Sequence, residues 1–233
     1  MISQIEALLA WAAPMRDDLV AAKTEYFAAT GGDVHEDDRC YEQRMQGFFN
    51  YYLFDRRRPD DDSTPVERYL RERGATLGGQ DKDALIGCTS SRLGLYEYRG
   101  RGSFLRRAGK GEVRVRDALS GVNFDVLERR QMNGLETGDL FEARLVPMGG
   151  TFHFSTSFTY HPRAMRRAIA REVKKRRKAG KLTDPRAFCW ELEKMALQAE
   201  RFRNVPIEAI YNFETPFLGQ RRARAAGEAA HHG

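Results

Sequence analysis

Hydrophobic residues change their spacing twice along this chain. Up to about residue 92 they recur every three or four positions, as Ile5 and Leu8 do, which is the period of one helix face. Over residues 94–160 apolar and polar residues alternate, and the helical period returns after residue 162. Because strands alternate and helices do not, this order predicts an α+β fold with helices on both sides of a sheet.

The middle stretch predicts five short strands separated by turns that contain glycine. In the last of them, Phe154 and Tyr160 belong to the face expected to point inward, while His153 and Ser155 belong to the outward face. Strands at this spacing predict a small five-stranded antiparallel sheet that curls like a barrel. The predicted strands cover residues 95–99, 112–116, 122–126, 140–146 and 151–160.

Capping signals and aromatic density predict where the helices lie. A Ser or Thr followed three residues later by Glu, or an Asp followed by Pro, is typical of a helix start. Residues 39–55 are rich in aromatic side chains around their whole circumference, so we expect a helix buried on more than one side. The predicted helix starts are Ser3 with Glu6, Thr64 with Glu67, and Asp184 with Pro185.

These patterns divide the chain into four regions. Residues 1–92 form a helical region, residues 93–161 the barrel-like sheet, and residues 162–218 the C-terminal helices. Residues 219–233, which are polar and rich in arginine and alanine, are expected to be a disordered tail.

Four segments together resemble an uncharacterised bacterial protein family in which an aromatic helix precedes a small β-barrel. The resemblance covers roughly residues 40–165 and implies the same order of elements here. Some members of that family carry a Cys-rich SEC-C zinc motif, which this sequence lacks, so zinc binding does not carry over. No activity of the family is established, and no catalytic residue is transferred. The segments are FFNYYLFD from residue 48, GLYE from residue 94, VRDALSG from residue 115 and LETGDLFEARLVPMGG from residue 135.

Composition narrows the class of protein. The chain has 233 residues, of which 41% are hydrophobic, enough to fill a core. It contains no apolar run long enough to span a membrane and no signal-like start. The three cysteines, Cys40, Cys88 and Cys189, form no CxxC pair, as expected of a protein in the reducing cytoplasm. We expect no metal and no cofactor.

Charge is distributed unevenly. The net charge is +6, yet residues 1–62 hold 13 acids against 7 bases, a local charge of −6 that leaves +12 on the remainder. A basic C-terminal part favours an anionic partner such as nucleic acid. An arginine-rich proteome would give the same charge without such a partner, so both interpretations stay open.

Two basic segments are the candidate site. The predicted helix over residues 163–181 carries ten cations against Glu172 alone, and the loop and strand over residues 100–116 add more. Ten cations on about 27 Å of helix can contact several phosphates, although a solvated helix face has the same pattern. The residues predicted to bind nucleic acid are Arg166, Arg167, Arg171, Lys174, Lys175, Arg176, Arg177, Lys178, Arg106, Arg107, Arg114 and Arg116.

The predicted sheet offers a second surface. Tyr96 and Tyr98 lie close in sequence to strand arginines, including Arg144, and would stack bases if they faced outward, as aromatic side chains of OB-type barrels do. Burial of both rings is the alternative.

Catalytic signatures are weak. His35, His153 and His161 have no metal-binding spacing, and the sequence contains no P-loop, no GxGxxG and no nucleophile elbow.

Three hypotheses follow. The first is a non-enzymatic cytoplasmic protein that binds RNA or another single-stranded nucleic acid through the basic helix and the sheet. Duplex DNA ranks lower because no helix-turn-helix pattern is visible. The second is a protein-interaction module whose acidic, aromatic N-terminal region docks a partner protein. The third and weakest is an enzyme with an unrecognised site near His153.

Overall fold

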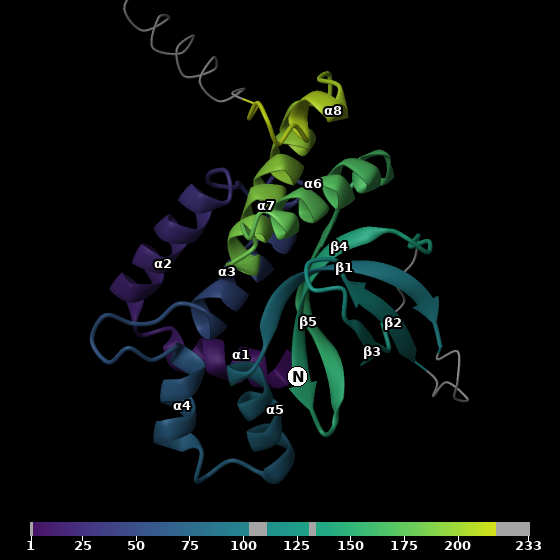
Figure 1. Ribbon diagram of the computed structural model, residues 1–233. Helices are drawn as coiled ribbons and strands as arrows, with labels where there is room; N and C mark the ends of the chain where they lie inside the picture. The colour runs from purple at the N-terminus through teal and green to yellow at the C-terminus, as the bar shows by residue number, and fades with distance from the viewer. Residues whose placement is uncertain (1, 103–110, 131–133, 218–233) are drawn as a thin grey trace, which may run out of the picture.

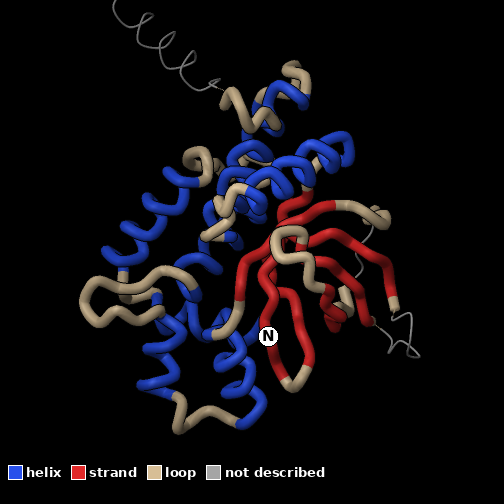
Figure 2. The backbone as a smooth tube through the Cα atoms, viewed as in Figure 1, coloured by secondary structure: helices blue, strands red, loops and turns tan. Residues whose placement is uncertain are grey.

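The computed structural model describes residues 2–102, 111–130 and 134–217. Helices gather on one side and across one end of the molecule, and the strands form a strongly curved sheet on the other side (Figure 2). The α+β prediction is therefore confirmed. No helix in these described ranges is both long and apolar enough to cross a membrane.

Five helices precede the strands and pack around the aromatic helix α3 (Figure 1). Phe48, Tyr52 and Leu53 of α3 are buried in a core shared with α1 and α2, as the aromatic density of this segment predicts. Large apolar rings buried on several sides supply most of the stability of such a core. The helices are α1 (Ile2–Ala12), α2 (Arg16–Ala29), α3 (Tyr41–Phe54), α4 (Pro65–Arg73) and α5 (Gly79–Thr89).

The predicted helix starts hold in two of three cases. The Thr64 hydroxyl accepts from the Glu67 backbone N–H, and the Glu67 carboxylate accepts from the Thr64 N–H at 2.8 Å, which is a complete capping box. The Asp184 carboxylate accepts from the Arg186 N–H at 2.9 Å. The start at Ser3 is wrong, because α1 begins at Ile2 and Ser3 lies inside the helix.

Five strands pair in the order β1-β2-β3-β5-β4, and β4 returns to β1, so the sheet closes on itself. Four of the five pairings are antiparallel, whereas β3 and β5 run parallel, with Val126 opposite Phe152. The prediction of a purely antiparallel sheet is therefore wrong. The strands are β1 (Arg92–Arg101), β2 (Glu112–Asp117), β3 (Asn123–Leu127), β4 (Leu140–Met148) and β5 (Thr151–Tyr160).

The parallel step follows from the route of the chain. After β3 the chain crosses over and places β4 beside β1, and β5 then returns antiparallel to β4 and meets β3 from the other side. Alternation within each strand predicts which side chains share a face, but it contains no information on which strands are neighbours.

The interior of the closed sheet is aromatic. Tyr96, Phe141 and Phe154 are buried there and contact one another edge-to-face or tilted. Tyr160, predicted to point inward, is instead 50% exposed. The bulge between Phe154 and Phe158 does not change the face, because Tyr160 still lies opposite the interior residue Phe141 and stacks on Phe158. Tyr160 is the last residue of β5, which is where the interior of the sheet meets solvent.

The C-terminal helices cover one end of the sheet. Ile169 and Val173 of α6 are buried against Leu95 and Leu140 of the strands and against α7. The helix therefore lies across the sheet with one face buried and the opposite face in solvent (Figure 1). The elements are a 3₁₀ turn (Arg163–Met165), α6 (Arg166–Lys178), α7 (Pro185–Arg201) and α8 (Ile207–Ile210).

Candidate functional site

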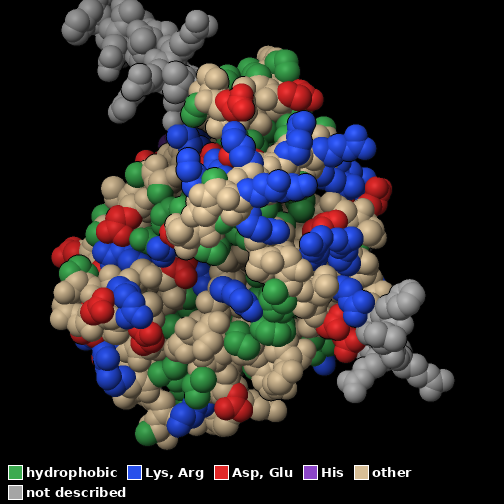
Figure 3. Space-filling model, viewed as in Figure 1, with side chains coloured by type: hydrophobic (Ala, Val, Ile, Leu, Met, Phe, Trp, Pro, Cys, Tyr) green, Lys and Arg blue, Asp and Glu red, His purple; other side chains and the backbone are tan. Residues whose placement is uncertain are grey.

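The basic helix α6 separates its apolar and charged faces along its length. Ile169 and Val173 are buried, and the single acid Glu172 is 9% exposed. Lys and Arg side chains cover the outward face, and they form the band over α6 in the space-filling view (Figure 3). The structure divides these cations into those that the protein itself engages and those that it leaves free.

Three of the predicted cations of α6 have carboxylate partners. Arg166 pairs with Asp139, and Arg176 contacts Glu172 at 2.7 Å and Glu191 at 2.6 Å. Lys175 lies 3.6 Å from Glu172 and is 63% exposed. Hydrogen bonds that Arg176 donates to the carboxylates of Glu191 and Glu172 raise its pKa, as expected for a guanidinium held by two acids. Arg166 therefore ties α6 to Asp139, and Arg176 ties it to α7.

Two further cations bind backbone carbonyls. Arg177 donates to Ala118 O at 2.7 Å and Leu119 O at 2.6 Å, which ties the end of α6 to the turn after β2. Arg116 donates to Gly121 O at a longer 3.4 Å. Both keep their full positive charge beside the helix, because a carbonyl does not neutralise a guanidinium.

The remaining four cations of α6 share one ridge of the helix. All are exposed, and the part of the chain that the structure describes offers none of them an ion-pair partner. Their spacing of four, three and four residues keeps them on one side of the helix over about 16 Å. We name this set the cation stripe: Arg167, Arg171, Lys174 and Lys178.

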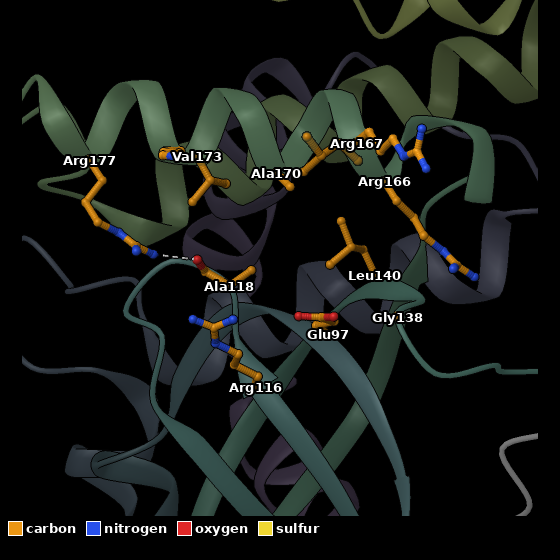
Figure 4. Close-up of a pocket in the computed structure, with 12 residues that line it drawn as sticks. Glu97, Arg116, Ala118, Gly138, Leu140, Arg166, Arg167, Ala170, Val173 and Arg177 are labelled. Atoms are coloured by element: carbon orange, nitrogen blue, oxygen red, sulfur yellow. Dashed lines mark hydrogen bonds between the residues drawn. The ribbon is translucent and has the colours of Figure 1, made fainter.

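A groove of about 530 Å³ lies between α6 and the sheet, beside the cation stripe. Leu140, Ala170 and Val173 line its middle, Arg116 lies on its floor, and Arg166 and Arg177 lie towards its two ends (Figure 4). Arg167 and Lys174 also line it. We name this hollow the α6 groove.

The arginines of the sheet contribute less to the candidate site than predicted. Arg114 lies 3.0 Å from Asp125 on the next strand. Arg144 is buried, pairs with Asp55 and donates to Ser91, so it faces α3 and α5 rather than solvent. Arg106 and Arg107 lie outside the described residues.

The rings proposed as a stacking surface are not available. Tyr96 and Tyr98 are 1% and 7% exposed and belong to the interior of the closed sheet. Burial raises the pKa of Tyr96, in agreement with a hydroxyl removed from water. The prediction that these two tyrosines face outward and stack bases is therefore wrong, and both rings are buried.

The acidic N-terminal region pairs with its own arginines. Asp18 lies 3.5 Å from Arg58, and Glu25 lies 2.8 Å from Arg56. Arg56 lowers the pKa of Glu25 through this hydrogen bond. Among the described ion pairs, none joins α6 to an acid of residues 1–62. The negative charge of that region therefore does not neutralise the basic helix.

Sequence reasoning missed a second group of charged residues, buried between α3, α7, β4 and the end of β5. Glu193 accepts from the Tyr26 hydroxyl at 2.8 Å and from Arg44 at 3.2 Å. Beside them, His161 contacts Glu142 at 3.0 Å through Nε2 and the Tyr211 hydroxyl at 3.1 Å through Nδ1. We name this group the buried polar cluster: Tyr26, Arg44, Glu142, His161, Glu193 and Tyr211.

Burial sets the protonation of this cluster. It raises the pKa of Glu142 well above its usual value, with the negative charge of Glu193 acting in the same direction. It lowers the pKa of His161 to about 3. His161 is therefore neutral near pH 7, and burial favours the neutral form of Glu142, in which the acid donates to His161 Nε2 while Nδ1–H donates to Tyr211. A signal existed in the sequence: Glu142 interrupts a strand that is otherwise mostly apolar.

This cluster has no visible metal-binding geometry. Within the described ranges, no three or more His, Cys, Asp or Glu side chains are arranged to hold a metal ion. Perturbed pKa values occur at structural ion-pair networks as well as at active sites. The α6 groove, with its free cations at the surface, is therefore the better candidate site.

Comparison with known proteins gives one match. Residues 14–194 match the family described as a family of unknown function, DUF7986. No curated protein and no solved structure is significantly similar to the chain. The expected resemblance to an uncharacterised family is therefore confirmed. The family description names no function.

Proposed function

The chain belongs to DUF7986, a family of unknown function, and we propose that it binds single-stranded nucleic acid, RNA in the first place, through the cation stripe. One observation carries this proposal: four exposed cations share one ridge of α6 and have no acidic partner within the described chain. Unpaired cations at regular spacing suit the phosphates of a flexible strand, which release counterions on binding.

The surroundings of the stripe support an anionic ligand. Arg116 and Arg177, whose hydrogen-bond partners in the described chain are backbone carbonyls, line the neighbouring groove and add positive charge to it, against the single acid Glu97. Clefts in which one sign of charge predominates focus the electric field and raise the rate at which ligands of the opposite sign arrive.

The sheet gives weaker support by analogy. Its strand order, with one parallel pairing between β3 and β5, resembles that of OB-type sheets, which bind single strands. An analogy of fold carries less weight than a site, and the buried Tyr96 and Tyr98 remove the stacking surface that such sheets use. The free thiols of Cys40, Cys88 and Cys189 fit the cytoplasmic location that this proposal includes.

The rival function is a protein-interaction module that docks a partner through the acidic, aromatic N-terminal region. The aromatic side chains that motivated it, such as Phe48 and Tyr52, are buried in the core, and Asp18 and Glu25 are engaged by arginines. That region therefore offers few free groups to a partner, and we favour nucleic acid.

The experiment is a salt series on a labelled single-stranded RNA. Four phosphate contacts predict a slope of about −2.8 in log K against log salt, a loss of roughly 50-fold between 50 and 200 mM. Changing all four stripe residues to Gln should remove most of this slope. Gln keeps the helix propensity of Lys and Arg, so folding is preserved.

A matched control removes the same charge elsewhere. Arg16, Lys23, Arg73 and Lys82 are exposed cations of the N-terminal helices, and their change to Gln should alter the slope little. Equal losses in both variants would show that net charge alone attracts the RNA, and absence of binding at low salt would reject the proposal. Duplex DNA and single-stranded DNA serve as competitors.

A further inference from the structure

The α6 groove has a polar floor of defined composition. On the sheet, Glu97 of β1 lies directly opposite Arg116 of β2 on one side and opposite Leu140 of β4 on the other. These three residues therefore form one row across the strands, and all three line the groove. In Figure 4 the carboxylate of Glu97 lies at the sheet side of the hollow, between Arg116 and Gly138.

The opposite wall is apolar. Ala170 and Val173 point from α6 towards the sheet (Figure 4), and Ile169 of the same helix also lines the groove. The cations of the stripe lie at the outer edge. The hollow thus combines an apolar middle, a cationic rim and a single carboxylate on the floor, within the 300–1,000 Å³ range of small-ligand sites.

Both ends of the groove are fixed. Arg177 holds the turn after β2 through Ala118 O at 2.7 Å, and Arg166 holds Asp139 just before β4. Asp139 is 5% exposed and also accepts from the Glu136 N–H at 2.7 Å. A hollow held at both ends is ready for a ligand without rearrangement, which lowers the entropic cost of binding.

A nucleotide matches this distribution of groups. Its phosphate suits the rim cations Arg167 and Lys174, and its flat base suits the apolar middle. An acidic peptide matches the rim but brings no planar apolar group, and its carboxylates would meet Glu97. Charge and shape therefore favour one nucleotide of a single strand, whose unstacked bases proteins read on their Watson–Crick edges.

The carboxylate of Glu97 selects among the bases. An ionised carboxylate only accepts hydrogen bonds and has two oxygens to do so. Guanine presents two adjacent donors, N1–H and the 2-amino group, whereas the Watson–Crick edges of adenine, cytosine and uracil each present one. The Glu97 side chain is 25% exposed, and its carboxylate lies 3.0 Å from Arg99, which orients it.

We propose that the α6 groove binds one guanine nucleotide of a single-stranded RNA, with Glu97 accepting from the base and the rim cations holding the phosphate. This inference rests on the proposed function, because the strand is delivered by the cation stripe. It goes further in naming a base preference.

The test compares the affinity of the intact protein for three labelled heptamers of uridine whose central residue is guanosine, adenosine or inosine. Guanosine should bind about tenfold more tightly than adenosine, within the range of a bidentate contact. Inosine lacks the 2-amino group and should fall between them. The Glu97→Gln variant should reduce the preference for guanosine over adenosine to less than threefold.

Glu112→Gln is the matched control, because Glu112 lies on β2 outside the groove, and it should keep the preference. Urea unfolding of each variant separates loss of fold from loss of contact. Equal affinity for the three heptamers, or a guanosine preference that survives in Glu97→Gln, overturns this inference. Salt-dependent binding of plain oligouridine would still stand in that case, so the proposed function fails only if that binding is absent.

Discussion

Arg44 and Arg171 both project from helices of this protein, but their surroundings are opposite. Arg44 is 4% exposed and is held by Glu193 and Thr30 in the buried polar cluster. Arg171 belongs to the cation stripe, is exposed, and has no ion-pair partner in the described chain. A buried charge has to be paired because desolvation is costly, whereas an exposed charge is stable without a partner.

This difference separates stability from binding. Every charge in the buried polar cluster is used inside the protein, so changes there should alter the free energy of unfolding. The charges of the stripe are not used inside, so changes there should alter ligand affinity and leave unfolding almost unaffected. The predictions below test this separation, beginning with the largest expected effect.

Removing Arg44 should be the most damaging single change. Arg44→Ala leaves the Glu193 carboxylate buried with only the Tyr26 hydroxyl as a partner. An orphaned buried charge costs about 3–5 kcal/mol, and urea unfolding measures this loss. Adding Glu193→Gln removes the orphaned charge, so the double variant should lose less than the sum of the two single variants. Additive losses would contradict the pairing.

The pH dependence of stability tests the second half of the cluster. The raised pKa of Glu142 gives stability that is present below its unfolded pKa of about 4.5 and is lost as pH rises through its folded pKa. His161, with a folded pKa of about 3, has the opposite effect. Its contribution to the free energy of unfolding is present above its unfolded pKa of about 6.5 and is lost as the pH falls. The two contributions therefore oppose each other as the pH falls from 6.5, because the folded protein favours a neutral His161 and a neutral Glu142.

Glu142→Gln should expose the contribution of His161 alone. Gln is always neutral, so the variant keeps the His161 contribution, about 2 kcal/mol from pH 6.5 to pH 4.5, without the opposing contribution of Glu142. Its free energy of unfolding should therefore fall more steeply with falling pH than that of the wild type. Tyr26, Arg44, Glu193 and Tyr211 also face this site and remain the same in both proteins. Glu136→Gln, at an exposed acid, is the control and should add no slope. A variant as flat as the wild type would show that His161 does not stay neutral on folding.

The two neighbouring arginines Arg166 and Arg167 provide the next comparison. Arg166 pairs with the buried Asp139, while Arg167 is exposed on the stripe. Arg166→Ala should lower the free energy of unfolding by about 1–2 kcal/mol, because Arg163 and the Glu136 N–H still hold that carboxylate. Arg167→Ala, one residue later on the same helix, should cost under about 0.5 kcal/mol. Equal costs would mean that the ion pair does not anchor α6.

The sequence predicts the positions of helices and strands better than it predicts which strands pair. Thr64, Glu67, Asp184 and the apolar positions of α6 act locally, and each lies where its pattern indicates. The parallel pairing of β3 with β5 and the bulge in β5 depend on contacts between distant segments, which alternation does not encode. Tyr160 shares the interior face that alternation predicts, but its 50% exposure at the end of β5 depends on how the fold covers that end.

The sequence predicts which helix carries the candidate site, but not which of its cations are free to bind a ligand. Charge counting selected the cations from Arg166 to Lys178 as one group. Only the fold shows that Arg166, Arg176 and Arg177 are engaged by Asp139, Glu191 and Ala118, and that the stripe is not. Likewise Glu142 and Glu193 are 51 residues apart in sequence, and nothing local indicates that they approach each other.

The smallest expected effect on stability is also the sharpest test of the comparison. Arg171→Ala should change the free energy of unfolding by less than about 0.5 kcal/mol, since the side chain has no described ion-pair partner and Ala is a good helix former. If Arg171 contacts one phosphate, the slope of log K against log salt for single-stranded RNA should become shallower by about 0.7. Lys82→Ala, at an exposed cation of α5, should leave both quantities unchanged. If Arg171→Ala is destabilised and its salt slope is unaltered, Arg171 is a structural charge like Arg44. That outcome would contradict the proposal that the cation stripe binds a ligand.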